Sequence, residues 1–244
     1  YRLPREILDR EIEGLKKSGF QTITDISVGH DIGIEELRRD FDAIYVAIGA
    51  HTNRKIGVEG EDAGGVISAV EMLREIGDDH YPDFSGMNIV VVGGGNVAMD
   101  VARSAVRLGA RSVKIAYRRR RVDMTALPEE VEGAIADGCE ILELNSPVRI
   151  EKDEKGHCKA LIVKPQIIGP VRYGRPSPKD SEAAEESIAA DRVLVAIGQG
   201  IDFRKFAEYS GIKIEQGRIS AFDISEIEDA KGIFAGGDCV TGPA

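Results

Sequence analysis

One stretch decides the fold of this chain: Asn88-Ile-Val-Val-Val-Gly-Gly-Gly-Asn-Val-Ala-Met-Asp100. An apolar strand runs into the pattern Gly93-x-Gly95-x-x-Ala98, and a helix follows. Gly93 permits a tight turn off the strand, Gly95 lets a pyrophosphate approach the backbone, and Ala98 lets helix and strand pack closely. The helix N-terminus then offers free N–H groups and a positive dipole end to phosphates. The sequence therefore predicts a dinucleotide-binding fold.

The next predicted strand, residues 113–117, is followed by arginines and not by an acidic residue. The residue after this strand usually meets the adenosine ribose, where a carboxylate would accept hydrogen bonds from a 2′-hydroxyl. Arg118 and Arg119 stand there instead, and each charge-assisted hydrogen bond to a 2′-phosphate is worth about 1.5–3 kcal/mol. The pattern favours NADP over NAD. The alternative is a solvated basic turn, since runs of charge often lie at the surface.

The charge balance excludes several classes of protein. The chain has 244 residues with 32 Lys and Arg against 42 Asp and Glu, a net charge of −10. An acidic chain is a poor candidate for binding nucleic acid or an anionic membrane. No apolar run reaches the length of a membrane-spanning helix, and no signal peptide is visible. We therefore expect a cytoplasmic protein with no nucleic-acid or membrane partner.

The three cysteines, Cys139, Cys158 and Cys239, form no CxxC pair and no metal-ligand spacing. We expect buried thiols, a reducing compartment and no metal site. Because the chain starts at Tyr1 and not at Met, we also expect it to be an internal piece of a longer protein.

Strands and helices alternate along most of the chain, which favours an α/β fold with a mostly parallel sheet. Two buried strands, 41–50 and 191–198, both close with Ala-Ile-Gly and flank the dinucleotide segment. The repeat predicts an inserted domain. We expect a Rossmann-like three-layer (ββα) domain with an antiparallel meander at residues 55–199, including the linker. It interrupts a partial second domain made of residues 1–54 and 200–244.

Several segments outside the dinucleotide stretch carry local patterns. Alternation predicts a strand at 20–26, and Pro128 and Gly138 bound a predicted helix that ends at Ala136. Residues 169–186 hold three prolines and predict an exposed polar loop, and a helix is expected over 202–209. Short alternating segments predict the antiparallel meander at 139–144, 148–152 and 159–165.

Four stretches occur in the order found in one family: Tyr1-Arg-Leu-Pro-Arg-Glu-Ile-Leu8, Asp42-Ala-Ile-Tyr-Val-Ala-Ile-Gly-Ala50, Gly93-Gly-Gly-Asn-Val-Ala-Met-Asp100 with Tyr117-Arg-Arg119, and Gly232-Ile-Phe-Ala-Gly-Gly-Asp-Cys-Val-Thr-Gly-Pro-Ala244. In these stretches the chain resembles the two-dinucleotide-domain flavoprotein reductases. It is most similar to the small (beta) subunit of NADPH-dependent glutamate synthase and related FAD/NAD(P)-binding oxidoreductases. The resemblance implies that residues 1–54 and 200–244 belong to an FAD-binding domain and residues 55–199 to an NAD(P)-binding domain.

The implied reaction passes a hydride from NADPH to FAD, chemistry that belongs to the cofactors, so no catalytic side chain is expected. The glycine turn would hold the pyrophosphate, the arginines the 2′-phosphate, and the last stretch the flavin. The cofactor-binding residues expected from the glycine pattern and the resemblance are Gly93, Gly95, Asn96, Val97, Ala98, Arg118, Arg119, Gly198, Gly237, Asp238 and Val240.

Two features of the family are not found in the sequence. No glycine fingerprint for the ADP half of FAD comes before Tyr1, and no cysteines for iron–sulfur clusters are present. We expect FAD and iron–sulfur centres in the parent protein, and an inactive piece when it is isolated. The resemblance implies a glutamate synthase large subunit or another acceptor protein as partner. Two alternatives remain: a non-catalytic NADP-binding module, and a related flavin reductase that delivers electrons to ferredoxin or a pyrimidine.

Overall fold

A computed structural model describes residues 2–172, 174–202, 212–215, 217–221, 227 and 230–242. The chain divides into two compact units, residues 1–52 with 199–244 and residues 53–198. The sequence placed the domain boundaries at 54/55 and 199/200. The two connections, β2 (Thr52–Asn53) and β12 (Gln199–Gly200), pair as a two-stranded sheet.

A five-stranded parallel sheet forms the centre of the larger unit, with the strands in the order β3-β11-β4-β5-β6. Their bounds are Val66–Ser68, Arg192–Val195, Asn88–Val92, Ser112–Tyr117 and Glu140–Glu143, respectively. β4 lies in the middle, and its last four residues are buried. A strand covered on both faces has no polar side to present, which explains its unbroken apolar sequence.

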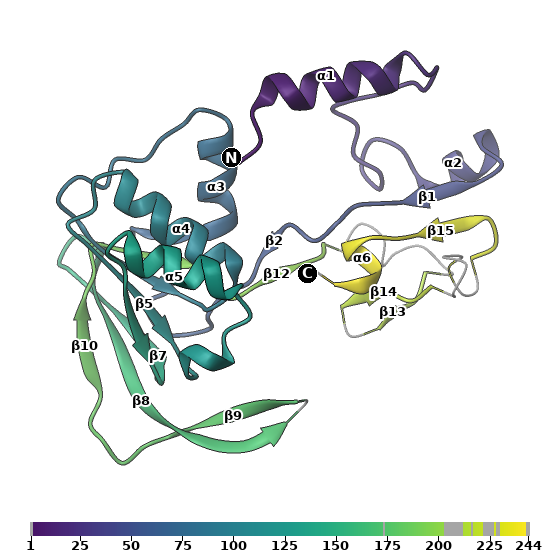
Figure 1. Ribbon diagram of the computed structural model, residues 1–244. Helices are drawn as coiled ribbons and strands as arrows, with labels where there is room; N and C mark the ends of the chain where they lie inside the picture. Colours follow the sequence, from purple (N-terminus) through teal and green to yellow (C-terminus); the bar gives the residue numbers. More distant parts are fainter. Residues whose placement is uncertain are drawn as a thin grey trace. The chain divides into compact units, whose positions relative to one another are not determined.

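Two layers cover this sheet (Figure 1). On one face, Ile89 and Val91 of β4 pack with the helices α3 (Ala69–Gly77), α4 (Asn96–Arg107) and α5 (Pro128–Ala136). On the other face, Val90 and Val92 pack with an antiparallel sheet. That second sheet consists of β7 (Asn145–Lys152), β8 (Cys158–Arg172), β9 (Arg175–Asp180) and β10 (Glu186–Ala189). The expected three-layer α/β fold is confirmed.

The prediction that residues 139–144 join the antiparallel meander is wrong. β6 pairs with β5 in parallel and belongs to the central sheet. A short alternating segment is compatible with either kind of pairing. The crossover through α5 decides the matter, because it returns the chain in the direction of β5.

The prediction of an exposed loop at 169–186 is also wrong for most of that range, since residues 169–172 and 175–180 lie in strands. β8 continues to Arg172, and β9 returns against it, with Pro176 opposite Val171 and Pro178 opposite Ile168. β9 is an edge strand, because it pairs only with β8 among the described residues. Proline is tolerated at an edge, where its missing N–H leaves no ladder bond unmade. The resulting β8–β9 hairpin extends beyond the other strands of its unit (Figure 1).

The smaller unit has its own core, which includes Ile34, Val46, Ile233 and Cys239. Its elements are α1 (Arg5–Lys16), α2 (Ile34–Asp40), β1 (Ile44–Val46), β13 (Ile214–Glu215), β14 (Arg218–Ile219), β15 (Ile233–Ala235) and α6 (Asp238–Thr241). β1 and β15 are parallel neighbours, which joins two segments far apart in the sequence.

The predicted strand at 20–26 is not formed. The larger apolar side chains of this segment, Phe20, Ile23 and Ile26, are exposed. Alternation makes a strand only where a neighbour accepts its hydrogen bonds, and the described residues supply no such neighbour here. The helix expected over 202–209 lies outside the described residues from 203 onward.

Candidate functional site

The glycine turn follows β4. At two of its glycines, neighbouring atoms of the protein leave no space for a side chain. Gly93 has φ +146°, and a Cβ there would collide with the carbonyl oxygen of Ala196 at the end of the neighbouring β11. A Cβ on Gly94 would lie 2.5 Å from the ring of Tyr117. Both positions therefore exclude a side chain.

Gly95 differs, because the protein leaves space beside it. Its φ is −101°, and a Cβ would come no nearer than 3.4 Å to a neighbouring heavy atom, Oγ1 of Thr125. Alanine would fit here with little adjustment of the protein. The glycine instead keeps a concave stretch of backbone open, as a closely approaching pyrophosphate requires. This geometry fits a dinucleotide.

The first turn of α4 supplies N–H groups next to this opening. The amides of Ala98 and Met99 donate to the carbonyl oxygen of Gly95, at 2.9 and 3.3 Å. The amides of Asn96 and Val97 precede the first intrahelical bonds, so they have no acceptor inside the helix. Such amides, at the positive end of a helix of 12 residues, form an anion-binding arrangement.

Asn96 and Ala98, both predicted cofactor residues, have different surroundings in the structure. Oδ1 of Asn96 accepts a hydrogen bond from the amide of Leu127 at 2.9 Å, so this side chain ties α4 to the start of α5. The donors that Asn96 could offer to a phosphate are therefore its backbone amide and its Nδ2 group, since Oδ1 can only accept. Ala98 is fully buried against the sheet, where a small side chain permits close packing.

Arg118 and Arg119 follow β5 directly. Arg118 is exposed and has no hydrogen bond or ion pair with any described residue. Nε of Arg119 donates to the carbonyl oxygen of Pro176 at 2.7 Å. Although Arg118 is exposed overall, partial loss of solvent around its guanidinium, together with the positive charges of Arg119 and Arg175, lowers its pKa. By contrast, Arg120 is neutralised by Asp123, with two contacts of 2.8 and 3.0 Å.

The list of predicted cofactor residues omits three neighbours of the site: Tyr117, Thr125 and Arg175. The hydroxyl of Tyr117 donates to the carbonyl oxygen of Asp123 at 2.8 Å and accepts from Nη2 of Arg175 at 2.9 Å. Thr125 donates its amide to the carbonyl oxygen of Gly94. Tyr117 ends its strand beside the glycine turn and could have been noticed. Arg175 gave no signal, because it stood in a predicted loop.

Gly198 lies near the carboxyl ends of the strands of the central sheet, as the glycine turn does. It comes two residues after Ala196, whose carbonyl oxygen borders Gly93, and it follows β11. Its φ is +109°, it is exposed, and a Cβ would touch nothing within 4 Å. Its glycine therefore serves the backbone conformation, while the space beside it is open.

Gly237, Asp238 and Val240 form a separate group in the smaller unit, after β15. Gly237 has φ +71°, and its carbonyl oxygen accepts from the amide of Val240 at 2.8 Å. Asp238 is half-buried. The preceding Gly236 excludes a side chain, because a Cβ would collide with the hydroxyl of Tyr45.

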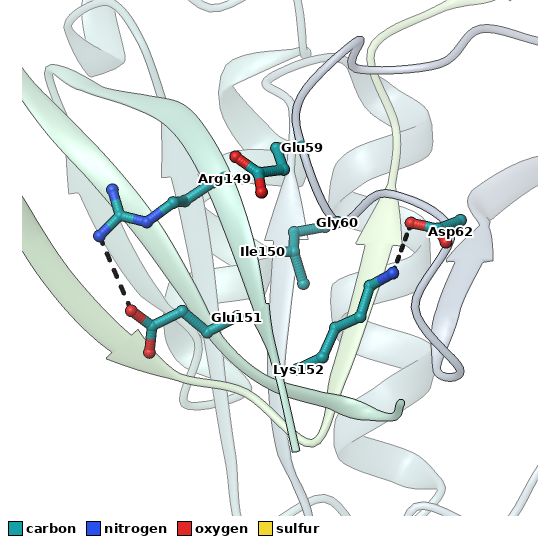
Figure 2. A pocket seen from close by; sticks show the side chains of 7 residues that line it. All are labelled: Glu59, Gly60, Asp62, Arg149, Ile150, Glu151 and Lys152. Atoms are coloured by element: carbon teal, nitrogen blue, oxygen red, sulfur yellow. Dashed lines mark hydrogen bonds and ion pairs between the residues drawn. The ribbon is translucent and has the colours of Figure 1, made fainter. Parts of the chain in front are cut away.

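A cavity of about 500 Å³ lies elsewhere in the larger unit (Figure 2). Its charged side chains pair with one another, for example Lys152 with Asp62 at 2.7 Å and Arg149 with Glu151 at 3.7 Å. It is lined by Glu59, Gly60, Asp62, Arg149, Ile150, Glu151 and Lys152. None of the predicted cofactor residues is among them, so the cavity is not the predicted site.

The cysteines are buried and unpaired. Burial raises the pKa of the thiols of Cys139 and Cys158 to about 11, with a smaller contribution from nearby carboxylates. Over the described residues, no three or more His, Cys, Asp or Glu side chains are grouped so as to hold a metal ion. In the same part of the chain, every helix is too short or too polar to span a membrane.

Comparison with known proteins finds relatives that match almost the whole of this chain. The beta subunit of an NADP(+)-dependent formate dehydrogenase from Moorella thermoacetica is 40% identical over 245 residues, covering 99% of this chain and 34% of that protein. The glutamate synthase [NADPH] small chain of Escherichia coli is 31% identical over 258 residues, covering 99% of this chain and 54% of that protein. The chain thus spans about a third to a half of the length of these relatives.

Among solved structures, FprA from Mycobacterium tuberculosis in complex with NADPH has a TM-score of 0.78. The sequences are 21% identical, and the match covers 97% of this chain and 67% of FprA, so the likeness is one of fold. The family described as pyridine nucleotide-disulphide oxidoreductase matches residues 10–244. The expected resemblance to the glutamate synthase small subunit and its relatives is confirmed. This chain therefore belongs to the pyridine nucleotide-disulphide oxidoreductase family.

Proposed function

We propose that this chain is the NADPH-binding portion of a flavoprotein oxidoreductase that passes a hydride from NADPH to FAD. The observation that carries the proposal is the placement of Arg118, which no carboxylate among the described residues neutralises, directly after the strand beside the glycine turn. A 2′-phosphate supplies the negative charge that these surroundings lack. The NADPH complex of FprA, a structure of the same fold, supports the same reading.

Each part of the larger unit then has a role. The amides of Asn96 and Val97 hold the pyrophosphate above Gly95, while Arg118 and Arg119 hold the 2′-phosphate. Gly198 leaves room at the edge of the sheet for the rest of the nucleotide. When bound, NADPH supplies the hydride and FAD accepts it, so the protein has only to bind and orient them and exclude water.

This chain holds fewer of the residues that an FAD site needs than of those that an NADPH site needs. Gly237, Asp238 and Val240 are the candidates for flavin contact. The 244 residues contain a single strand–glycine–helix fingerprint, the one at Gly93. A second would be needed for the ADP half of FAD. We propose that residues 1–52 and 199–244 form part of an FAD-binding domain, and we derive no step through the flavin.

Two more specific proposals differ in the protein that exchanges electrons with this chain. The glutamate synthase type would have a large subunit as partner, and 31% identity to a small chain supports it. The formate dehydrogenase type is favoured by the higher identity of 40% to a beta subunit. Under either proposal, this chain would belong to a subunit that binds NADPH and exchanges electrons with a partner protein. We further propose a cytoplasmic location, where NADPH is available and the unpaired thiols stay reduced.

The test is rapid mixing of the natural, full-length protein with NADPH or NADH under argon, following the flavin absorbance. We expect NADPH to bleach the flavin, with an apparent affinity at least about tenfold higher than that of NADH. A colourless protein that binds NADPH would show a non-catalytic module instead. Equal affinities for the two nucleotides would refute the assignment of the 2′-phosphate.

A further inference from the structure

The β8–β9 hairpin contacts the candidate nucleotide site at its first residue after the turn. Arg175 begins β9, and its Nη2 donates to the hydroxyl of Tyr117 at 2.9 Å and to the carbonyl oxygen of Asp123. The ring of Tyr117 in turn lies against Gly94. A side chain from the second sheet therefore reaches the glycine turn of the central sheet.

The next residue of the hairpin makes a second contact of the same kind. The carbonyl oxygen of Pro176 accepts from Nε of Arg119 at 2.7 Å. Arg175 and Pro176 thus hold the residues on either side of Arg118, namely Tyr117 and Arg119. Arg118 stays unbonded between them among the described residues.

These contacts place three guanidinium groups near one another. The positive charges of Arg119 and Arg175 disfavour the charged form of Arg118 and so lower its pKa. Both guanidinium groups therefore lie within electrostatic range of Arg118. No carboxylate among the described residues pairs with any of them, whereas Arg103, Arg120 and Arg149 all have acidic partners. Like charges held together repel, and a bound dianion relieves that repulsion.

The hydrogen bonds of Arg175 leave part of its fork available. Both bonds to the wall of the site use Nη2. Nη1 and Nε have no acceptor within the part of the chain that the structure describes. An arginine fork of this kind suits the oxygens of a phosphate better than a lysine does, since its donors are planar and fixed.

We propose that Arg175 determines cofactor specificity, adding a third guanidinium to the 2′-phosphate site of Arg118 and Arg119. The β8–β9 hairpin is then the element that sets the preference for NADP over NAD. This inference rests on the proposed function, that the site binds NADP. It extends that function to a residue 57 positions beyond Arg118 in the sequence.

The experiment is calorimetric titration of the full chain with two probes, 2′,5′-ADP and 5′-AMP, which differ only in the 2′-phosphate. Arg175→Gln should weaken 2′,5′-ADP binding by about tenfold and 5′-AMP binding by less than about twofold. Arg175→Lys keeps the charge and should recover part of the loss. The wild type should also show a steeper fall in 2′,5′-ADP affinity with added salt than Arg175→Gln.

Two controls separate charge from structure. Lys179→Gln removes a positive charge from the same strand, four residues away or about 13 Å along it, and should change neither affinity. Tyr117→Phe removes one of the two acceptors that position Arg175 but keeps all three guanidinium groups, so it should reduce the preference for 2′,5′-ADP by less than Arg175→Gln does.

The outcomes distinguish the two proposals. If Arg175→Gln weakens both probes equally, or neither, Arg175 does not determine specificity and the inference fails. If the wild type binds both probes equally, the assignment of the NADP site fails first. If Arg118→Ala abolishes the preference while Arg175→Gln keeps it, the NADP site stands and only the role of Arg175 is lost.

Discussion

Gly94 and Tyr117 fit against each other so closely that a Cβ on Gly94 would lie 2.5 Å from Cε2 of the tyrosine ring. The ring is held from its other end, where its hydroxyl bonds the carbonyl oxygen of Asp123 and a guanidinium nitrogen of Arg175. The glycine turn and the residues after β5 are therefore packed and hydrogen-bonded together. A substitution in either segment should alter the conformation of the other.

Gly94→Ala should destabilise the larger unit through this contact. Gly94 does not have a positive φ, so the penalty is steric, and we expect the free energy of unfolding to fall by about 1–3 kcal/mol. Urea unfolding followed by circular dichroism measures it. In combination with Tyr117→Ala the penalty should shrink, because the obstructing ring is gone. Strictly additive effects of the two substitutions would argue against the contact.

Gly95→Ala should separate binding from stability. A Cβ at this position meets only Oγ1 of Thr125 at 3.4 Å, so we expect the unfolding free energy to change by less than about 0.5 kcal/mol. The methyl group would occupy the space that the pyrophosphate needs, and NADPH affinity should fall by at least about tenfold. Thermal melting and calorimetric titration measure the two effects. Unchanged affinity would remove the pyrophosphate from this place.

Arg118→Ala should weaken NADPH binding by at least about tenfold and NADH binding much less, because one charged hydrogen bond to the 2′-phosphate is lost. The matched control is Arg120→Ala, two residues further along the same basic run. Arg120 is already neutralised by Asp123, so its removal should leave the ratio of the two affinities unchanged. Fluorescence titration with both nucleotides gives the ratio. Equal losses for NADPH and NADH in Arg118→Ala would indicate a solvated basic turn.

Cys139 and Cys158 should resist alkylation in the folded protein. Their thiols have a pKa of about 11, mainly because they are buried. At pH 8 about one thiol in a thousand would be ionised even if it were accessible, and the thiolate is the reactive form. Mass spectrometry after iodoacetamide treatment, with and without denaturant, locates the modified residues. Modification of either cysteine within minutes in the native protein would contradict the burial.

Asp137 should contribute to the acid sensitivity of the larger unit. The hydrogen bond from Arg103, 2.8 Å from Nε to Oδ2, lowers the pKa of this carboxyl below its ordinary 3.8. A carboxyl with a lowered folded pKa stabilises the protein above 3.8, and that contribution is lost as the pH falls toward the folded value. Asp137→Asn should flatten the fall in stability below that pH, measured by acid titration of circular dichroism. Glu132→Gln, on the exposed side of α5, is the control and should leave the fall as it is.

Local signals in the sequence predicted the elements whose ends are set by nearby residues. The helix expected from Pro128 to Ala136 is α5 with the same bounds, because proline starts a helix well and Gly138 ends it in a positive-φ conformation. The turn at Gly93 is similar, since an unbroken apolar strand, a glycine and a helix follow one another within a few residues.

The failed predictions share one cause. Segments 20–26, 139–144 and 169–186 have patterns that suit several structures, and a strand forms only where a partner accepts its hydrogen bonds. β6 became parallel because of its neighbour β5, and β9 formed although it contains Pro176 and Pro178. In each of these cases the partner strand, and not the segment, decided the result.

The sequence by itself determined the glycine turn, the helix behind it and the arginines after β5, because backbone sterics and chain order act over short distances. Only the tertiary structure decided that Arg175 reaches Tyr117, 58 residues earlier, and that Pro176 holds Arg119. Those contacts depend on how β8 and β9 pair and on how the second sheet packs against the first. Strand pairing and sheet packing join residues whose separation along the chain carries no information about their distance in space.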